Sequence, residues 1–527
     1  MSVLNDESGR PYKVHLCKTD ISQNNNKFYD MELYKSAGGS HFTVKMINGR
    51  IGYRGVTHTK EFSSSEAARK FFDAKFREKT HLEWAERDAE PIFGKYVVVE
   101  LATNSKKPVE PKKEEEPEPV EHATEPEPVK TRGRSRKAKR EVKTEPEPEH
   151  EGYSFVDEQV KDLMKCICDE DVHLGLLKQL KFNEEHGKPI DCLSLAQLET
   201  GYEILAAIEK SIGGRRAARS STRNRSAIAP SSSGASMHDT NKYYSLIPHS
   251  FGFQVPPKID TLAKVQSERE LLDALKGSIE AAQSVQDLKK QASKKDIYHR
   301  LYERLPCQLE PVSAEIGEKI GECLKLRGPT HAYKCSYVNA FELKVQEQDQ
   351  LAEPPKPSKR ARRGAAAAAE AVAEKRLLWH GTRVTNVFSI LMNGLNIPEG
   401  DRYGLMFGNG VYFANMPTKS ANYCSWEASR RVFMLLCEVD VSNPLILYES
   451  EVDAVEKIVK EKKASVYAAG KNRPTETIDI NGTLAFKSGL IEIDEPTDLL
   501  YDEYVMFDTQ KWKIKYVVEV NVERARI

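Results

Sequence analysis

Five side chains in the last third of the chain could do chemistry together: His380, Tyr412, Ser420, Tyr423 and Glu503. His380 directly follows a strand-like apolar run and precedes a glycine, a threonine and an arginine. The two tyrosines flank the serine in a stretch whose glycines let backbone approach a ligand. Glu503 lies among hydrophobic residues, where a carboxylate is costly unless it is paired or used.

Each of these residues also has an ordinary structural interpretation. A histidine at the end of a strand is more often structural than catalytic, a tyrosine in a strand is usually a core residue, and the glutamate could lie on an exposed edge. A site is favoured because the residues occur in order inside three long segments, WHGTRVTN, FGNGVYFANMPTKSANYC and LYDEYVMFD.

The elements that must position these segments are mainly strands within residues 313–527. The runs RRVFMLLCEVDV, YDEYVMFD and WKIKYVVEVNV are β-rich and have little helical period. A basic and alanine-rich insertion near 352–376 interrupts them, and its KRARR is either an import signal or a plain exposed loop. The Phe407–Gly410 stretch lacks the third glycine and the βαβ setting of a Rossmann site, so a Rossmann dinucleotide site is not expected.

The residues upstream divide into three further parts. Residues 1–102 are predicted to be β-rich with one capped helix, and residues 151–312 to be a helical bundle with a disordered loop near 213–236. Between them, the Glu-Pro repeats of 103–150 predict an extended, charged linker. Its basic block, Arg132 to Arg140, is an import signal, a phosphate-binding tether or a soluble spacer.

Composition limits the class of protein. A chain of 527 residues is too long for one core. Its 79 Lys and Arg balance 79 Asp and Glu, so net charge says nothing about an anionic partner. No apolar run approaches the ~20 residues that span a bilayer, so no membrane role is expected. Nine cysteines without a CxxC pair predict reduced thiols in a cytosolic or nuclear protein, and no residue calls for a metal.

The order and the amino-acid residues of the three segments resemble the catalytic motifs of the poly(ADP-ribose) polymerase family. YYSLIPHSFGFQVPP resembles part of its autoinhibitory helical domain, and the first hundred residues resemble its WGR domain. The resemblance covers most of the chain outside the linkers, and it is nearest to the short, DNA-damage-activated type without zinc fingers. It implies a multidomain α+β fold: a β-rich WGR domain, an all-α regulatory bundle, and a mixed α+β transferase domain built on a split antiparallel sheet.

The resemblance implies that NAD is the substrate and assigns roles in cleaving its nicotinamide-ribose bond. Tyr412 and Tyr423 would stack on the nicotinamide, while the Gly381 backbone and the Ser420 hydroxyl would bind its amide. The ribose of the adenosine would be held by His380 and Thr382. Further cofactor-binding positions implied by the resemblance are Ser389 and Asn396.

The catalytic residues implied by the resemblance are Glu503, His380 and Tyr412. Glu503 would stabilise the developing ribose cation and polarise the acceptor hydroxyl. Two departures from the family pattern bear on the acceptor and on adenosine: Asn409 stands where Lys is usual and Asn396 where Arg is usual. The donor loop NIPEGDRYGLM is also shorter than usual.

The WGR-like segment departs from the family at its name-giving residues. The resemblance implies Asn48, Gly49, Arg50 and Arg54 as DNA-binding positions. Because Asn48-Gly49-Arg50 stands where Trp-Gly-Arg is usual, contact with a DNA break is expected to rest more on Arg50, Arg54 and neighbouring basic residues. A generic protein-binding β domain is the alternative interpretation of this segment.

The resemblance implies a nuclear enzyme that senses DNA nicks or strand ends and adds poly(ADP-ribose) to itself, to histones and to repair proteins, with a possible accessory catalytic factor. Two other functions remain open at this stage. Transfer of single ADP-ribose units is suggested by Asn409 and the short loop, whereas Glu503 argues against it. A DNA-end-binding scaffold with a degenerate transferase fold is the non-enzymatic alternative.

Overall fold

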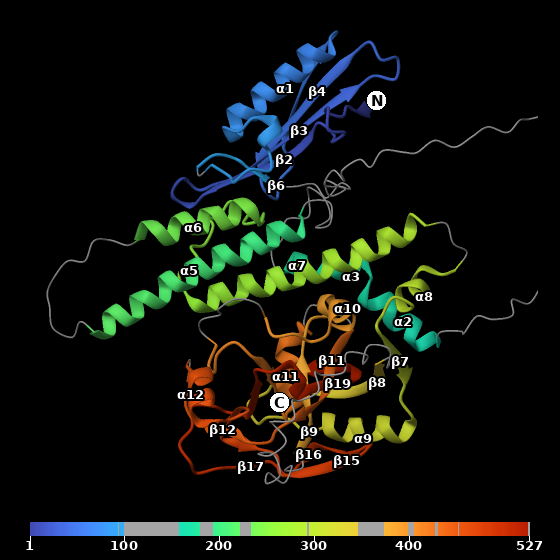
Figure 1. The fold of residues 1–527 in the computed structure, drawn as a ribbon, viewed down its shortest axis with the longest axis vertical. Helices are drawn as coiled ribbons and strands as arrows, with labels where there is room; N and C mark the ends of the chain where they lie inside the picture. Colours follow the sequence, from blue (N-terminus) through green and yellow to red (C-terminus); the bar gives the residue numbers. More distant parts are fainter. Residues whose placement is uncertain are drawn as a thin grey trace, which may run out of the picture. The chain divides into compact units, whose positions relative to one another are not determined.

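The computed structural model describes residues 1–92, 94–99, 157–179, 193–221, 233–291, 295–345, 374–398, 405–426, 431–451 and 453–524. The predicted linker at 103–150 lies outside these residues, as do part of the predicted loop near 213–236 and nearly all of the insertion near 352–376. Residues 1–103 and 157–527 form one compact unit. Figure 1 follows this unit from the blue N-terminal strands through green helices to the orange and red sheets.

The N-terminal part is a six-stranded antiparallel sheet covered by one helix. The order is β5-β4-β3-β2-β6, and β1 pairs with β3. The elements are β1 (Ser2–Val3), β2 (Lys13–Asp20), β3 (Asn25–Lys35), β4 (Phe42–Arg50), β5 (Val56–Phe62), α1 (Ser65–Thr80) and β6 (Val97–Val99). The Ser64 hydroxyl caps α1, as expected for a helix start. Phe72 and Phe76 of α1 pack into the core of the sheet with Trp84.

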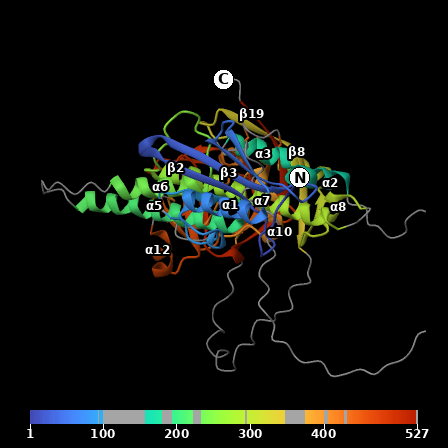
Figure 2. The same cartoon turned by 90° about the horizontal axis from the view of Figure 1, so that it is seen from above.

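The next part consists of helices packed around one long central helix. They are α2 (Glu158–Ile167), α3 (Glu170–Gln179), α5 (Leu195–Ser221), α6 (Ser233–Leu246), α7 (Leu262–Lys289) and α8 (Ile297–Tyr302). Helix α7 contacts α3, α5 and α8, and α5 also contacts α6; the two views show α5, α6 and α7 alongside one another (Figures 1 and 2). Within the bundle, Arg269 of α7 forms a buried ion pair with Glu209 of α5 at 2.8 Å.

The apolar core of these helices continues into the N-terminal sheet. Phe28 and Val97 of the sheet belong to the same buried cluster as Leu205, Tyr243 and Leu272 of the helices. Burial of this shared apolar surface stabilises the two parts together, because each would otherwise expose it to water.

The C-terminal part is built on two main sheets. A seven-stranded sheet has the order β15-β16-β9-β11-β19-β8-β7, and a four-stranded sheet has the order β10-β18-β13-β12. All neighbours are antiparallel except β16 with β9 and β12 with β13. The elements are β7 (Cys307–Pro311), α9 (Ala314–Leu324), β8 (Tyr333–Val345), β9 (Lys375–Gly381), α10 (Val384–Asn393), β10 (Val411–Phe413), α11 (Pro417–Ala421), β11 (Val432–Asp440), β12 (Pro444–Leu447), α12 (Ala454–Glu461), β13 (Ser465–Ala468), β14 (Asn472–Arg473), β15 (Glu476–Ile480), β16 (Thr483–Ser488), β17 (Ile491–Glu492), β18 (Glu503–Met506) and β19 (Trp512–Arg524).

The two sheets meet at a single bridge between Trp379 of β9 and Ala414, just after β10. Their backbones exchange hydrogen bonds of 2.8 and 2.9 Å. The sheet is therefore split, with β9 ending on one side of the division and β10 and β18 lying on the other. This arrangement confirms the fold class that the sequence predicts.

Two further findings concern the whole of the described chain. No helix in it combines the length and apolar character needed to cross a membrane. Its eight cysteines are all buried and unbridged, namely Cys17, Cys166, Cys168, Cys307, Cys323, Cys335, Cys424 and Cys437.

Candidate active site

His380 lies at the end of β9, where the two sheets divide. Its Nδ1 is 3.0 Å from the carbonyl oxygen of Tyr412 on β10. Burial holds the pKa of His380 below its usual value, against this hydrogen bond, so the ring is neutral at physiological pH. Because a carbonyl only accepts, Nδ1 carries the hydrogen and Nε2 is left as an acceptor.

Gly381 follows at the point where β9 meets α11. A Cβ atom at this position would lie 1.8 Å from the carbonyl oxygen of Ser420, so only glycine fits. The buried Ser420 hydroxyl donates to the carbonyl of Trp379 at 3.1 Å. The next residue, Thr382, is also buried, and its hydroxyl oxygen is 3.4 Å from the side-chain nitrogen of Asn386. The first and second motifs therefore touch through their backbones.

The two tyrosines of the second motif have different surroundings. The Tyr412 hydroxyl donates to the carbonyl of Gly408 at 2.9 Å and accepts from the backbone N–H of Phe407 at 3.2 Å, which holds the ring in place. In contrast, 58% of Tyr423 is exposed, which leaves its ring available to a ligand. Tyr423 lies in the short 3-10 turn, Asn422–Cys424, that directly follows α11.

Glu503 is the first residue of β18, which pairs with β10 and β13 and so lies in the middle of the smaller sheet. Its Oε1 is 2.8 Å from Nζ of Lys419, and only 14% and 15% of the two side chains are exposed. Lys419 Nζ also donates to the carbonyls of Tyr501 at 3.1 Å and Asp502 at 3.0 Å. Burial lowers the pKa of Lys419, although the charges of Glu503 and Asp502 oppose this.

The backbone beneath Glu503 is anchored by its neighbour Asp502, which is almost fully buried. The Asp502 carboxylate accepts from the backbone N–H of Gly470 at 2.8 Å and from the side chain of Asn415 at 2.7 Å. Arg473 approaches the same carboxylate, with Nε at 3.4 Å. Burial raises the pKa of Asp502, and these donors act against that rise by stabilising the charged form.

The three motifs converge on one place. Burial raises the pKa of Tyr412, and the charge of Glu503 raises it further. Although Tyr423 is more than half exposed, its buried remainder and then the charge of Glu503 raise its pKa too. In the pairing of β10 with β18, Tyr412 is opposite Val505, so Tyr412 and Glu503 lie on the same face of the smaller sheet as diagonal neighbours. Lys419 completes this group.

The helical part reaches the same region through α7. Arg383, which directly precedes α10, donates from Nη2 to Glu270 Oε2 at 2.6 Å and from Nη1 to the Glu270 backbone carbonyl at 3.1 Å. The charge of Glu270 also contributes to the raised pKa of Tyr423, after burial and Glu503. About two turns further along α7 the helices are in tight contact, because a Cβ at Gly277 would lie 2.3 Å from the carbonyl oxygen of Thr385.

Three other residues singled out from the sequence lie around the end of α10. Ser389 is half-buried, and its hydroxyl oxygen is 3.4 Å from the side-chain nitrogen of Asn393. Asn396 is exposed, and its side chain donates back to the carbonyl of Asn393 at 2.8 Å. Asn409 donates to the carbonyl of Pro398 at 2.7 Å. Both contacts thus hold the start of the donor segment, part of which lies outside the described residues.

The four residues predicted to bind DNA lie at the β4–β5 turn of the N-terminal sheet. Asn48 is half-buried in β4, and Gly49 is closely packed, since a Cβ there would lie 2.9 Å from Gly55 Cα. Arg50 is largely occupied: it donates to the carbonyls of Asn24, at 2.9 Å, and of Gly252 and Gln254 in the helical part. Arg54 is exposed. Their role in DNA binding stays a prediction.

Sequence reasoning missed three of these features. Lys419 was quoted within the second motif but was given no role, since a lone lysine gives no signal of its partner. The contact between Arg383 and Glu270 joins residues that are 113 positions apart. The acceptors of Arg50 in the helical part are 202 and 204 positions away. No local pattern reports such pairs.

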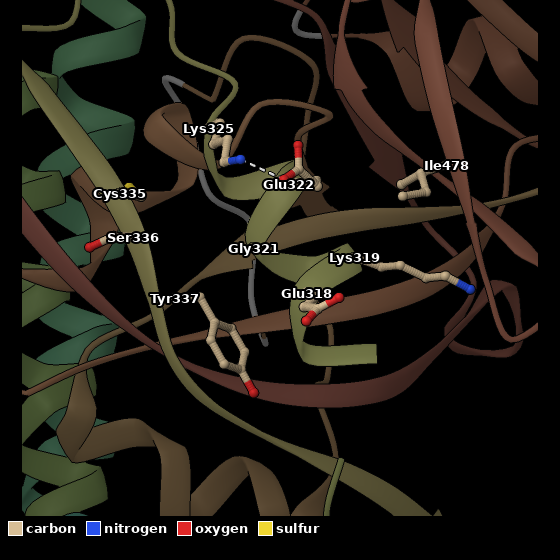
Figure 3. Close-up of a pocket in the computed structure, with 9 residues that line it drawn as sticks. All are labelled: Glu318, Lys319, Gly321, Glu322, Lys325, Cys335, Ser336, Tyr337 and Ile478. Atoms are coloured by element: carbon tan, nitrogen blue, oxygen red, sulfur yellow. Dashed lines mark hydrogen bonds and ion pairs between the residues drawn. The ribbon is translucent and has the colours of Figure 1, made fainter. Parts of the chain in front are cut away.

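A hollow of about 520 Å³ lies elsewhere in the C-terminal part, between α9, β8 and β15. Figure 3 shows Tyr337 on one side of α9 and Ile478 on the other, with the Lys319 side chain extending toward the Ile478 side. None of the residues predicted to hold NAD lines this hollow. Of its charged groups, Glu322 is paired with Lys325 at 2.5 Å and Lys319 with Glu315 at 2.8 Å, so the rim is largely neutralised.

The donor set around His380 suits an organic ligand with a flat ring and an amide. It offers a close glycine backbone, a serine hydroxyl, two phenols and a carboxylate. Nowhere among the residues that the structure describes do three or more His, Cys, Asp or Glu side chains gather as metal ligands would. These groups therefore suit a dinucleotide held by side-chain and backbone contacts.

Comparisons with known proteins agree with this geometry. Three family models match: the poly(ADP-ribose) polymerase catalytic domain at residues 313–522, the poly(ADP-ribose) polymerase regulatory domain at 154–302, and the WGR domain at 12–91. The chain is 64% identical to poly(ADP-ribose) polymerase 2 of Caenorhabditis elegans, over 99% of this chain and 98% of that protein. It is 29% identical to the human poly(ADP-ribose) polymerase 2, over 98% of this chain and 80% of that protein.

Proposed function

This chain belongs to the poly(ADP-ribose) polymerase family, and from that premise we propose which of its residues carry the reaction and what switches it on. Membership makes it an NAD ADP-ribosyltransferase, with NAD as substrate. The proposal assigns catalysis to Glu503, His380 and Tyr412. The observation that carries it is the ion pair of Glu503 with Lys419, which fixes a carboxylate on the sheet face that also carries Tyr412.

In this proposal the nicotinamide end of NAD is held by the crossing of β9 and α11. The Gly381 backbone and the Ser420 hydroxyl bind the amide, and the exposed ring of Tyr423 stacks on the nicotinamide. The close fit of Gly381 against Ser420 supports this, because it places backbone where a side chain would otherwise stand. Thr382 and Nε2 of His380 bind the adenosine ribose, and the proposal assigns Ser389 and Asn396 to the same ligand.

Glu503 acts on the ribose from which nicotinamide departs. Its carboxylate stabilises the positive charge that develops on the ribose and polarises the hydroxyl that attacks it. Lys419 supports this role because its ammonium pairs with the carboxylate, and its bonds to the carbonyls of Tyr501 and Asp502 hold that ammonium in place. Lys419 is therefore a positioning residue.

The test is to compare the parent with Glu503→Gln on labelled NAD and to resolve the products by size. We expect the variant to bind NAD nearly as well but to give single additions in place of ladders. Glu495→Gln, which makes the same charge change at an exposed position, is the matched control and should give ladders. Ladders of the parent's length from Glu503→Gln would refute the role given to this carboxylate.

The proposal places the switch in the two upstream parts. A DNA nick or strand end binds the WGR part, whose Arg50 holds a helical-part segment through Gly252 and Gln254. Helix α7 of the helical part in turn packs on α10 and holds Arg383 through Glu270. DNA binding then loosens α7 from the NAD site, which is allostery between two sites and two states.

The remaining parts of the proposal follow from the family and the domain set. The protein acts in the nucleus, modifies itself, histones and repair proteins, and works with an accessory factor that completes the acceptor side. To test its dependence on broken DNA, NAD consumption is measured with nicked, linear and covalently closed circular DNA. Stimulation by the first two alone is expected, and equal rates with all three would refute break sensing.

A further inference from the structure

An exposed pair of aromatic rings straddles the WGR and helical parts. Tyr53 follows β4 and is 37% exposed, while Phe253 lies in the segment between α6 and α7 and is 74% exposed. Their ring centroids are 4.6 Å apart, with an angle of 41° between the ring planes. Large aromatic side chains rarely stay this exposed in a folded protein unless the surface binds something.

Both rings are presented by turns that fit closely against each other. Gly52, with φ of +85°, leaves no room for a Cβ, which would lie 2.2 Å from the Ser250 hydroxyl oxygen. A Cβ at Gly252, with φ of +59°, would lie 3.4 Å from the Tyr53 hydroxyl oxygen. The Asn24 side chain donates to the carbonyl of Phe253 at 3.3 Å. The pair is thus held on a preformed surface, and little ordering is needed when a ligand binds.

Positive charge accompanies the rings. The guanidinium carbon of Arg50 is 5.8 Å from the centroid of the Phe253 ring. Its described hydrogen bonds go to carbonyl and amide oxygens, which are neutral, so they leave its charge uncompensated. Arg54, one residue from Tyr53, is exposed and forms no ion pair within the described chain. A flat apolar surface beside cations matches a nucleobase next to its phosphate.

This surface lies beside the position where the sequence lacks a stacking side chain. Asn48 pairs with Tyr29 and Val56 inside the sheet and offers an amide in place of an aromatic ring. We propose that Tyr53 and Phe253 form a composite stacking platform for the terminal base of a broken DNA strand, with Arg50 and Arg54 facing its phosphates. The inference rests on the proposed function, and it deepens that function by naming the part of the DNA that is recognised.

The platform takes one ring from each of two parts of the protein. A base stacked on it contacts the helical part directly, so recognition of the strand end does not pass through the WGR part alone. Stacking of this kind needs an open end, because an internal base pair has no free face. The contribution of Phe253 should therefore appear only with DNA that has an end.

The test uses the full-length protein and two duplexes of the same sequence. One has a single blunt end with 2-aminopurine as the terminal base, and the other is closed by hairpins at both ends. Affinity is measured by anisotropy, and stacking by 2-aminopurine fluorescence. The variants are Phe253→Ala, Phe253→Trp, which keeps a flat ring, and Val255→Ala, which trims a neighbouring exposed apolar side chain.

We expect Phe253→Ala to bind the open duplex about 10-fold more weakly, equivalent to about 1.4 kcal/mol, with a smaller change in 2-aminopurine fluorescence and unchanged affinity for the closed duplex. Phe253→Trp and Val255→Ala should behave like the parent. If Phe253→Ala bound the open duplex as the parent does, or lost affinity equally for both duplexes, the platform would be refuted while break sensing survived. If the parent itself did not distinguish the duplexes, break sensing would fail as well.

Discussion

Replacing Glu270 by glutamine should partly release the NAD site from the helical part. In the folded chain Arg383 reaches the Glu270 carboxylate at 2.6 Å and the Glu270 backbone carbonyl at 3.1 Å. The substitution removes the charge from the first contact and leaves the second intact. Because Glu270 lies on α7 and Arg383 at the start of α10, this contact is present only while the two helices are packed together.

The magnitude follows from the exposure of the two partners. A hydrogen bond between charged groups contributes roughly 1.5–3 kcal/mol when it is protected from water. Here 13% of Arg383 and 34% of Glu270 are exposed, so solvent screening reduces the contribution. About 1 kcal/mol remains, which corresponds to an approximately fivefold increase in the ratio of released to packed states. Activity without DNA should increase by about this factor.

The assay is NAD consumption by Glu270→Gln and by the parent, each with and without nicked DNA. The rate without DNA should increase about fivefold, whereas the rate with saturating DNA should stay the same because the site is already released. Asp287→Asn is the matched control: it removes the same charge from an exposed ion pair on the same helix and should change neither rate. If the DNA-independent rate of Glu270→Gln equalled that of the parent, the contact would have no part in regulation.

Three shorter predictions follow. Lys419→Met should lower kcat more than it changes the KM for NAD, and an unchanged kcat would contradict the pairing of Lys419 with Glu503. Because burial lowers the pKa of Lys419, its deprotonation can reduce activity in alkaline buffer, and the variant should lack that loss. Gly381→Ala should abolish activity and lower the Tm, since its Cβ would lie 1.8 Å from a backbone oxygen, and a fully active variant would show that the close approach is wrong. Burial opposes the charge on His15, but Cys17 and Asp30 raise the pKa of its imidazole to about 10. The protonated imidazole therefore stabilises the fold fully below about pH 6.5, and this contribution is lost as the pH rises toward 10. Asp30→Asn should flatten this part of the profile of Tm against pH, and an unaltered profile would refute the role given to His15.

Much of the fold follows from local pattern. The alternating residues of β3 and the apolar run of β19 appear as strands, and the helix that Ser64 begins is capped as its sequence indicates. These elements are encoded by neighbouring residues, so the sequence is enough to predict them. The division of the C-terminal sheet at Trp379 is different, because one bridge between distant segments makes it, and it was expected only through the resemblance to the family.

The candidate site divides in the same way. His380, Tyr412 and Glu503 are visible because they recur at set places in long motifs. Lys419 forms an ion pair with Glu503, but its significance depends on carbonyls and a carboxylate more than 80 positions away. Arg50 illustrates the converse: the sequence suggests DNA contact, whereas most of its described partners are acceptors that a distant turn brings to it. Pairings of this kind arise from tertiary structure and leave no local signature.

The place of β19 in the seven-stranded sheet has a consequence for biosynthesis. This strand, Trp512–Arg524, lies between β11 and β8. The ribosome synthesises β8, which begins at Tyr333, long before it reaches Trp512. A nascent chain on the ribosome therefore cannot complete its transferase sheet until β19 has emerged. Until then β8 lacks this neighbouring strand and its apolar surface stays exposed. Premature stop codons upstream of Trp512 would thus yield proteins whose sheet lacks β19. Chaperones would bind the exposed apolar surface of such proteins, and proteases would degrade them.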